Sequence, residues 1–258
     1  MNLVIDNLVA GLPGKKILRE ITVEIPDNEV HALMGPNGSG KSTLAGVIAG
    51  NPQFEIFEGS FSMGGMKISE MESFERARAG LFLAFQYPVE VPGITVGKFL
   101  KRAVELRRGE EGRFSVTEYI RELRHMMDYM GIDRNFINRY LNEGFSGGEK
   151  KRMEILQMLM LKPNFAILDE TDSGLDIDAL QIVAKGINRL REEGFGALLI
   201  THYQRILDYV KPDKIHVMVD GRIVLSGGPE IVDELEAKGY EWVRDTMQFE
   251  DMKVRLGA

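Results

Sequence analysis

The sequence of 258 residues contains no cysteine. Disulfide bonds, thiolate metal ligands and cysteine nucleophiles are therefore excluded. Basic residues are in the minority as well, because 39 Asp and Glu face 32 Lys and Arg and leave a formal charge of −7 at pH 7. Nucleic-acid-binding proteins usually present a basic surface, so this balance argues against a nucleic-acid partner.

Long apolar runs are also missing. No stretch approaches the ~20 apolar residues that cross a bilayer as a helix. The N-terminus, MNLVIDNLV, lacks the basic region and long apolar core of a secretory signal. We therefore expect a soluble, cytoplasmic protein with no direct membrane insertion, of a length that suits one large α/β domain or two small ones.

The clearest motif present is GPNGSGKS at Gly35–Ser42, which we call the phosphate loop. It matches G-x-x-x-x-G-K-[ST] and follows the apolar run Val30–Met34, as a loop between a strand and a helix should. Its glycines allow backbone N–H groups to curl around phosphate oxygens. We expect Lys41 to contact the β- and γ-phosphates of ATP, and Ser42 to hold Mg²⁺. The residues expected to bind the nucleotide here are Gly35, Pro36, Asn37, Gly38, Ser39, Gly40, Lys41, Ser42 and Thr43.

A helix is predicted to start at Ser146, because Ser146 and Glu149 have the S-x-x-E spacing of a capping box. Such a start leaves free backbone N–H groups at Gly147 and Gly148. Taken alone, this pattern is more often only a helix start than a binding site. Together with the phosphate loop and the acids described next, it indicates a protein that binds a nucleoside triphosphate.

Two acids follow a predicted buried strand. Phe165–Leu168 is a short apolar run, and Asp169 and Glu170 come at its carboxyl end, where open α/β sheets hold their ligands. We expect Asp169 to hold the metal through water and Glu170 to orient or deprotonate the attacking water. The alternative for Glu170 is an ordinary surface acid.

A histidine follows another buried strand. His202 comes after Ala197–Ile200 and could sense the γ-phosphate, although it could also be a core imidazole with only a structural role. Lys41, Glu170 and His202 are the expected catalytic residues. We assign no chemistry to His31, His125 or His216.

The remaining patterns predict an α/β body, residues 1–87 and 163–258, with a helical subdomain at 88–162, all within one domain. Residues 2–25 read as antiparallel strands, and Asp220-Gly221 reads as a two-residue hairpin turn. One helix, Val116–Met130, should bury the face formed by Val116, Tyr119, Ile120, Leu123, Met127 and Met130. The segment Tyr87–Ile94 is proline-broken and must be extended. It is a candidate docking edge for a partner, the alternative being a buried crossover.

The residues that follow Ser146 break a rule of helix composition. Lys150, Lys151 and Arg152 lie in the first turns of a helix, where cations oppose the macrodipole. A solvated charge run would explain them, and so would an anion such as triphosphate bound to a second chain. Our hypothesis is that Lys150 or Lys151 restrains Glu170 in the resting subunit.

These residues resemble the motifs of ABC-type ATPase subunits along nearly the whole chain. Beside the phosphate loop, Gln86 is similar to the Q-loop glutamine, FSGGE at 145–149 to the signature motif, and ILDE at 167–170 to the Walker B strand. SGLD at 173–176 is similar to the D-loop, and His202 to the switch histidine. The resemblance implies a P-loop NTPase fold of the ABC-ATPase type, with a mixed sheet core, an antiparallel β subdomain and a helical subdomain.

The resemblance also implies roles for residues outside the phosphate loop. Gln86 would contact nucleotide and Mg²⁺, and two chains would pair head to tail so that each signature motif closes over the other chain's ATP. The residues that it adds to the nucleotide site are Gln86, Ser146, Gly147, Gly148, Glu149 and Asp176. One departure concerns the base, because many ABC subunits stack adenine on an aromatic residue before the phosphate loop, and this chain has none before Phe54. Base selectivity is therefore expected to be weak. A second departure, Phe145 where leucine is commoner, exchanges one bulky apolar residue for another.

Within that superfamily the sequence resembles the SufC family, the ATPases of the SUF iron–sulfur cluster assembly system. The stretches FQYPVEVPG, GFSGGEKKR, ILDETDSGLDIDAL and THYQRILDYVKPD carry this likeness. It implies SufB and SufD scaffold proteins as partners. The alternatives are the ATPase subunit of a membrane importer, with the same chemistry, and an ATP-binding interaction protein that changes shape without turnover.

Overall fold

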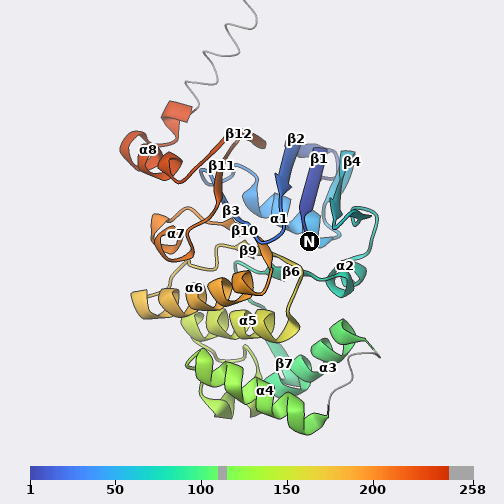
Figure 1. Cartoon of the computed structure of the whole chain (residues 1–258). Coiled ribbons are helices and arrows are strands. Elements are labelled where there is room, and N and C mark those ends of the chain that lie inside the picture. The colour runs from blue at the N-terminus through green and yellow to red at the C-terminus, as the bar shows by residue number, and fades with distance from the viewer. Residues whose placement is uncertain (110–114, 244–258) are drawn as a thin grey trace, which may run out of the picture.

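A six-stranded sheet forms the centre of the computed structural model, which describes residues 1–109 and 115–243 (Figure 1). Its strand order is β12-β11-β3-β10-β9-β6, and all strands run parallel except β12, which pairs antiparallel with β11. The strands are β3 (Val30–Met34), β6 (Leu81–Ala84), β9 (Phe165–Asp169), β10 (Gly196–Ile200), β11 (Lys214–Val219) and β12 (Arg222–Gly227). The sheet is therefore mixed, as predicted.

Both faces of this sheet are covered. Successive residues of β9 pack into different cores, Phe165 and Ile167 on one side and Ala166 and Leu168 on the other. A strand buried on both faces needs apolar residues at every position, which explains why β9 shows no polar alternation. Because the parallel strands end at the same edge, the residues that follow β3, β6, β9 and β10 gather there.

A second sheet is antiparallel, with the order β2-β1-β4-β5. It consists of β1 (Leu3–Leu12), β2 (Lys15–Ile25), β4 (Glu55–Met63) and β5 (Met66–Lys67). The predicted antiparallel strands at 2–25 are thus confirmed. This sheet shares a core with α1 (Lys41–Ala49) and one face of the central sheet.

Helices share one core with the opposite face of the central sheet (Figure 1). They are α3 (Val96–Arg108), α4 (Val116–Tyr129), α5 (Gly147–Leu161), α6 (Ile177–Glu192), α7 (Gln204–Val210) and α8 (Glu230–Lys238), with a 3₁₀ turn at Arg134–Asn138. Of these, α3 and α4 pack against α5 and not directly on the sheet. The predicted buried face of α4 is correct at Tyr119, Leu123, Met127 and Met130 but wrong at Val116, which is exposed because it opens the helix. Met126, which was not predicted, is buried instead.

The short strands β7 (Val91–Thr95) and β8 (Tyr140–Leu141) pair with each other beside these helices. Within the described ranges, every helix is too short or too polar to cross a membrane.

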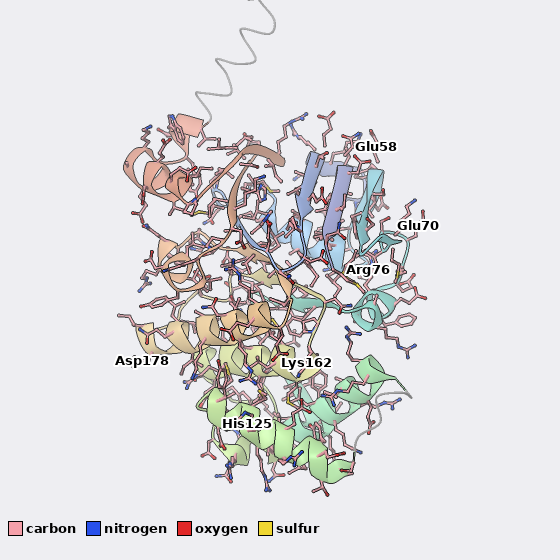
Figure 2. All side chains as sticks on the ribbon, in the orientation of Figure 1. Glu58, Glu70, Arg76, His125, Lys162 and Asp178 are labelled. Atoms are coloured by element: carbon pink, nitrogen blue, oxygen red, sulfur yellow. The ribbon has the colours of Figure 1, made fainter. Side chains whose placement is uncertain are left out.

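The C-terminal end of α1 is fixed by a buried cation. Arg76, on α2 (Ser73–Ala79), donates to the carbonyl oxygens of Val47 (2.7 Å) and Ile48 (2.8 Å) and to those of Met71 and Ser69 (Figure 2). A cation at a helix C-terminus satisfies carbonyls that have no partner within the helix. This contact holds the helix that follows the phosphate loop.

Candidate functional site

The phosphate loop connects β3 to α1 in a conformation that requires glycine. A Cβ on Gly35 would lie 2.2 Å from the carbonyl oxygen of Met218, so no larger residue fits there. Gly40 is the N-cap of α1 with a left-handed φ of 109°, and no side chain caps the helix. The N–H groups of the first turn of α1 therefore have no partner within the helix and point into the loop, which suits an anion.

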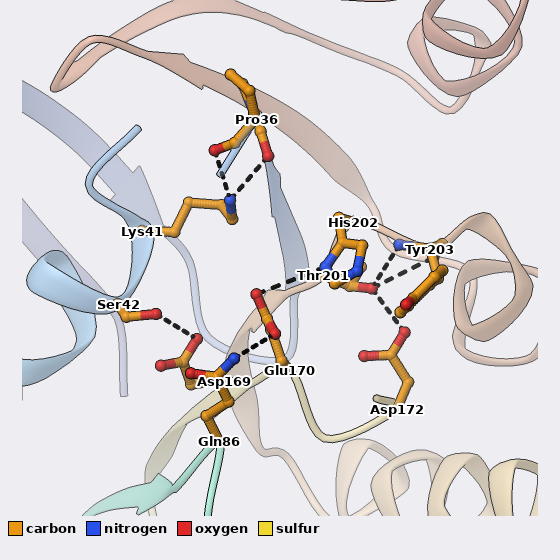
Figure 3. Close-up of polar contacts among 11 residues, drawn as sticks. Pro36, Lys41, Ser42, Gln86, Asp169, Glu170, Asp172, Thr201, His202 and Tyr203 are labelled. Carbon is orange, nitrogen blue, oxygen red and sulfur yellow. Dashed lines mark hydrogen bonds and ion pairs between the residues drawn. The ribbon is translucent and has the colours of Figure 1, made fainter. Parts of the chain in front are cut away.

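Lys41 reaches back over this loop. Its Nζ donates to the carbonyl oxygens of Gly35 (2.7 Å) and Pro36 (3.0 Å) (Figure 3). Burial lowers the pKa of Lys41, while the nearby carboxylates of Glu170 and Asp169 act in the opposite direction. The ammonium group is thus held inside the loop, within reach of any phosphate bound there.

Ser42 and Asp169 place two oxygen donors side by side. Ser42 Oγ donates to Asp169 Oδ1 at 3.3 Å, joining the start of α1 to the end of β9 (Figure 3). Burial raises the pKa of Asp169, and the hydrogen bond from Ser42 opposes that rise. Mg²⁺ is usually held by one or two carboxylates together with substrate phosphates, so this donor pair fits that ion.

Glu170 is held between two other strand ends. Gln86, after β6, donates from Nε2 to Glu170 Oε2 at 2.6 Å, and His202 Nδ1, after β10, lies 3.5 Å from Glu170 Oε1 (Figure 3). Glu170 itself has a left-handed φ of 47°, and its N–H donates to the carbonyl oxygen of Ile200 at 2.9 Å. A non-glycine residue held in this region costs on the order of 1–3 kcal/mol, which the surrounding contacts must offset. The carboxylate is therefore fixed beside Asp169 and Lys41.

A hydrogen bond between Thr201 and Asp172 lies next to His202. Thr201 Oγ1 donates to Asp172 Oδ2 at 2.7 Å and accepts from the N–H of Tyr203 at 3.0 Å (Figure 3). Burial raises the pKa of Asp172, opposed by the Thr201 hydrogen bond. This pair ties the segment after Glu170 to the residues on both sides of the histidine.

The hypothesis that a lysine of α5 restrains Glu170 is wrong. Lys150 Nζ bonds Glu90 at 2.8 Å, and Lys151 Nζ bonds the carbonyl oxygen of Phe85 at 2.5 Å. The physical reason is the direction of the helix, since Lys151 points into the protein toward the end of β6, and Lys150 toward the surface. Gln86 holds the Glu170 carboxylate instead, and His202 lies beside it.

The signature-motif residues lie apart from the phosphate loop. Ser146 is the N-cap of α5, with the predicted capping box: Ser146 Oγ accepts from the N–H of Glu149 at 3.3 Å, and Glu149 accepts from the N–H of Ser146 at 2.7 Å. Asp176 caps α6, accepting from the N–H of Ala179 at 2.8 Å. Among the residues that the structure describes, none of Ser146, Gly147, Gly148, Glu149 and Asp176 lines the cleft over the phosphate loop.

That cleft, of about 900 Å³, has a wall that the sequence did not predict. Lys15, Lys16, Ile17 and Arg19 of β2 line it together with the Asp220–Gly221 turn between β11 and β12. The predicted turn is confirmed, since both residues have positive φ, 48° and 81°. The N–H of Arg19 donates to the carbonyl oxygen of Gly221 at 2.8 Å, which joins the turn to β2. The adjacent lysines were the only local sign of this cationic wall.

Comparison with known sequences gives extensive matches. A family model described as ABC transporter matches residues 18–173. Vegetative protein 296 of Bacillus subtilis is 52% identical over 252 residues, which are 98% of this chain and 97% of that protein. A probable ATP-dependent transporter of Cyanophora paradoxa is 50% identical over 245 residues, which are 94% of this chain and 95% of its own length.

Solved structures show the same architecture. An ATP-binding subunit of an ABC transporter superposes with a TM-score of 0.77 at 25% identity, covering 92% of this chain and 94% of its own. An ATP-binding cassette described as dimeric, in a post-hydrolysis state with ADP and Pi, superposes with a TM-score of 0.76 at 20% identity, covering 88% and 98%. At that identity the likeness concerns the fold alone.

Proposed function

This chain belongs to the ABC transporter family and is an ABC-type ATPase with the expected fold, and we propose that its Mg²⁺-dependent ATP hydrolysis drives conformational change in a soluble scaffold for iron–sulfur cluster assembly. One observation carries the chemical part. The carboxylate of Glu170, hydrogen-bonded by Gln86 and 3.5 Å from His202, lies at the carboxyl ends of the parallel strands, beside Lys41 and the Ser42–Asp169 pair.

In this proposal each residue at the carboxyl ends of the parallel strands has a distinct role. The phosphate loop and Lys41 bind the β- and γ-phosphates, and Ser42 and Asp169 would hold Mg²⁺, which neutralises phosphate charge, with Gln86 at its margin. Glu170 accepts a proton from the attacking water, and His202 contacts the γ-phosphate. Phosphoryl transfer needs mainly positioning and charge stabilisation, which this arrangement supplies.

A second copy would complete the site. Ser146 and the N–H groups of Gly147 and Gly148 start a helix of 15 residues outside the cleft of their own chain. Head-to-tail pairing would bring them, with Glu149 and Asp176, to the γ-phosphate held by the partner copy. Loss of that shared phosphate on hydrolysis then removes the contact that favours the closed pair. A cassette of the same fold is described as dimeric, which is compatible with pairing of two copies.

The segment Tyr87–Ile94 is the proposed docking edge for the scaffold. Tyr87 is 79% exposed, Val89 69% and Ile94 43%, so the alternative of a buried crossover is wrong. Large apolar side chains exposed together favour a protein partner. The likeness to SufC-type sequences makes SufB- and SufD-like proteins the proposed scaffold, although relatives in Streptococcus pyogenes are named as probable transporter ATP-binding proteins.

Two measurements test this proposal. Steady-state ATP hydrolysis of the wild type should require Mg²⁺ and should be abolished in Glu170→Gln. Affinity purification of the full chain from its own cells should recover soluble scaffold proteins. Recovery of a polytopic membrane protein would favour the importer subunit instead, and ATP binding without hydrolysis in the presence of the recovered partner would favour a non-hydrolysing interaction protein.

A further inference from the structure

The peptide groups of Phe85 are held on both sides by one helix. β6 ends at Ala84, so the next N–H and C=O groups leave the sheet. The N–H of Phe85 donates to Glu154 Oε1 at 2.7 Å, and its carbonyl oxygen accepts from Lys151 Nζ at 2.5 Å. Glu154 and Lys151 lie one turn apart on α5. The residue just before Gln86 is therefore attached to α5 through two directed hydrogen bonds.

Stability alone does not explain this pair of charges. The side chains of Lys151 and Glu154 are only 6% and 5% exposed, and Lys151 Nζ lies 3.7 Å from Glu154 Oε2. Glu154 Oε2 is buried and has no hydrogen-bond partner among the residues that the structure describes. Burial raises the pKa of Glu154 to about 7 against the effect of Lys151. Apolar residues of similar size often replace a buried ion pair at no cost, but they could not make the two hydrogen bonds to the Phe85 backbone.

The contacts continue from Phe85 to the reacting end of the site. Gln86 donates from Nε2 to Glu170 Oε2 at 2.6 Å. In the other direction, α5 starts at the Ser146 N-cap, about 12 Å along the helix axis from Glu154. A single rigid helix thus links the signature-motif residues to the amide that holds the Glu170 carboxylate.

We propose that Lys151 and Glu154 are positioning residues that couple α5 to Glu170 through the Phe85 backbone and the Gln86 side chain. When the start of α5 engages the nucleotide of a second copy, any shift of the helix moves Gln86 and so resets the Glu170 carboxylate. This inference rests on the proposed function, because it assumes that Glu170 acts on the attacking water.

The test is a double-mutant cycle on ATP hydrolysis. Glu154→Ala removes the acceptor of the Phe85 N–H and should lower kcat by about tenfold or more, the effect of losing a hydrogen bond to a charged group. KM for ATP should change little, because the phosphate loop is untouched. Glu154→Gln keeps an oxygen that can accept from Phe85 and should restore most of kcat. In a Gln86→Ala background, Glu154→Ala should cause little further loss.

Controls separate positioning from folding. Glu122→Gln, which removes a half-buried carboxylate that pairs with Arg108 in the same helical region, should leave kcat unchanged. Hydrogen exchange at the Phe85 amide should accelerate in Glu154→Ala and stay slow in Glu154→Gln, which tests the contact without turnover. Effects of Gln86→Ala and Glu154→Ala that multiply independently, or an unchanged Phe85 amide, would overturn the coupling.

A different result would contradict the proposed function. Hydrolysis that persists unchanged in Glu170→Gln would show that Glu170 is not the acid that acts on water, whatever the cycle shows. Hydrolysis that depends on Glu170 but shows no coupling between Gln86 and Glu154 would overturn only the positioning role.

Discussion

The buried His216 should make the free energy of unfolding depend on pH. His31 Nδ1 and His216 Nε2 are 2.9 Å apart, and each ring has one more partner, Glu29 Oε2 at 2.8 Å for His31 and Ser226 Oγ at 2.7 Å for His216. Burial lowers the pKa of His216 to about 4, and the charges of His31 and Lys214 act in the same direction. The pair lies between β3 and β11, and β3 leads directly into the phosphate loop.

The direction in which stability changes with pH follows from how many protons the folded and unfolded states bind. As the pH falls through 6.5, the unfolded chain protonates His216, whereas the folded chain does so only near 4. The unfolded state binds more protons in that window, so stability is fully present above 6.5 and is lost as the pH falls toward 4. The whole difference corresponds to about 3 kcal/mol, of which about 2 kcal/mol is already lost at pH 5.

The perturbation is His216→Gln, which removes the titrating ring but keeps a donor and an acceptor. Urea unfolding at pH 7, 6 and 5 should show the wild type losing about 2 kcal/mol more than the variant between pH 7 and pH 5. The matched control, His125→Gln, makes the same substitution at an exposed histidine of α4. Parallel pH profiles for the wild type and His216→Gln would refute the reasoning, because titratable groups other than His216 would then account for the whole pH dependence.

Three further predictions concern the nucleotide. Glu170→Gln should form dimers in Mg-ATP, and sedimentation that shows only monomer at saturating nucleotide would contradict head-to-tail pairing. Lys41→Ala should weaken ATP binding by about 10- to 100-fold in a calorimetric titration, the effect of losing a charged hydrogen-bond donor. ATP and GTP should be hydrolysed with kcat/KM values within about tenfold, because the described residues that line the cleft include no Phe, Tyr or Trp on which a base could stack. A preference of 100-fold or more would show that another group reads the base.

Features that depend on neighbouring residues were predictable from the sequence. The predicted capping box at Ser146 is present, and the Asp220–Gly221 turn has the two positive φ angles that its composition requires. The gathering of residues at the carboxyl ends of the parallel strands was predictable too. Buried apolar runs such as β9 indicate parallel strands, and the carboxyl ends of parallel strands lie at one edge of the sheet. These predictions needed no knowledge of which segments pack together.

Features that join distant segments were not predictable. Nothing near Gln86 in the sequence indicates that its amide holds Glu170, and nothing near Lys15 or Arg19 places them over the phosphate loop. Both contacts depend on the order in which strands pair, which a local pattern does not specify. The partners of Glu170 therefore had to come from the structure.

The lysines of α5 show why a correct physical rule led to a wrong partner. Cations in the first turns of a helix oppose the macrodipole by roughly 0.3–1 kcal/mol each, so an anion was expected nearby. Successive residues of a helix point about 100° apart, however, and Lys150 and Lys151 meet different surroundings. Lys150 pairs with the Glu90 carboxylate at the surface. Lys151 instead donates to the Phe85 carbonyl oxygen and lies beside Glu154 in the interior. A hydrogen bond from a charged group contributes about 1.5–3 kcal/mol, which exceeds the dipole effect and decides where Lys151 points.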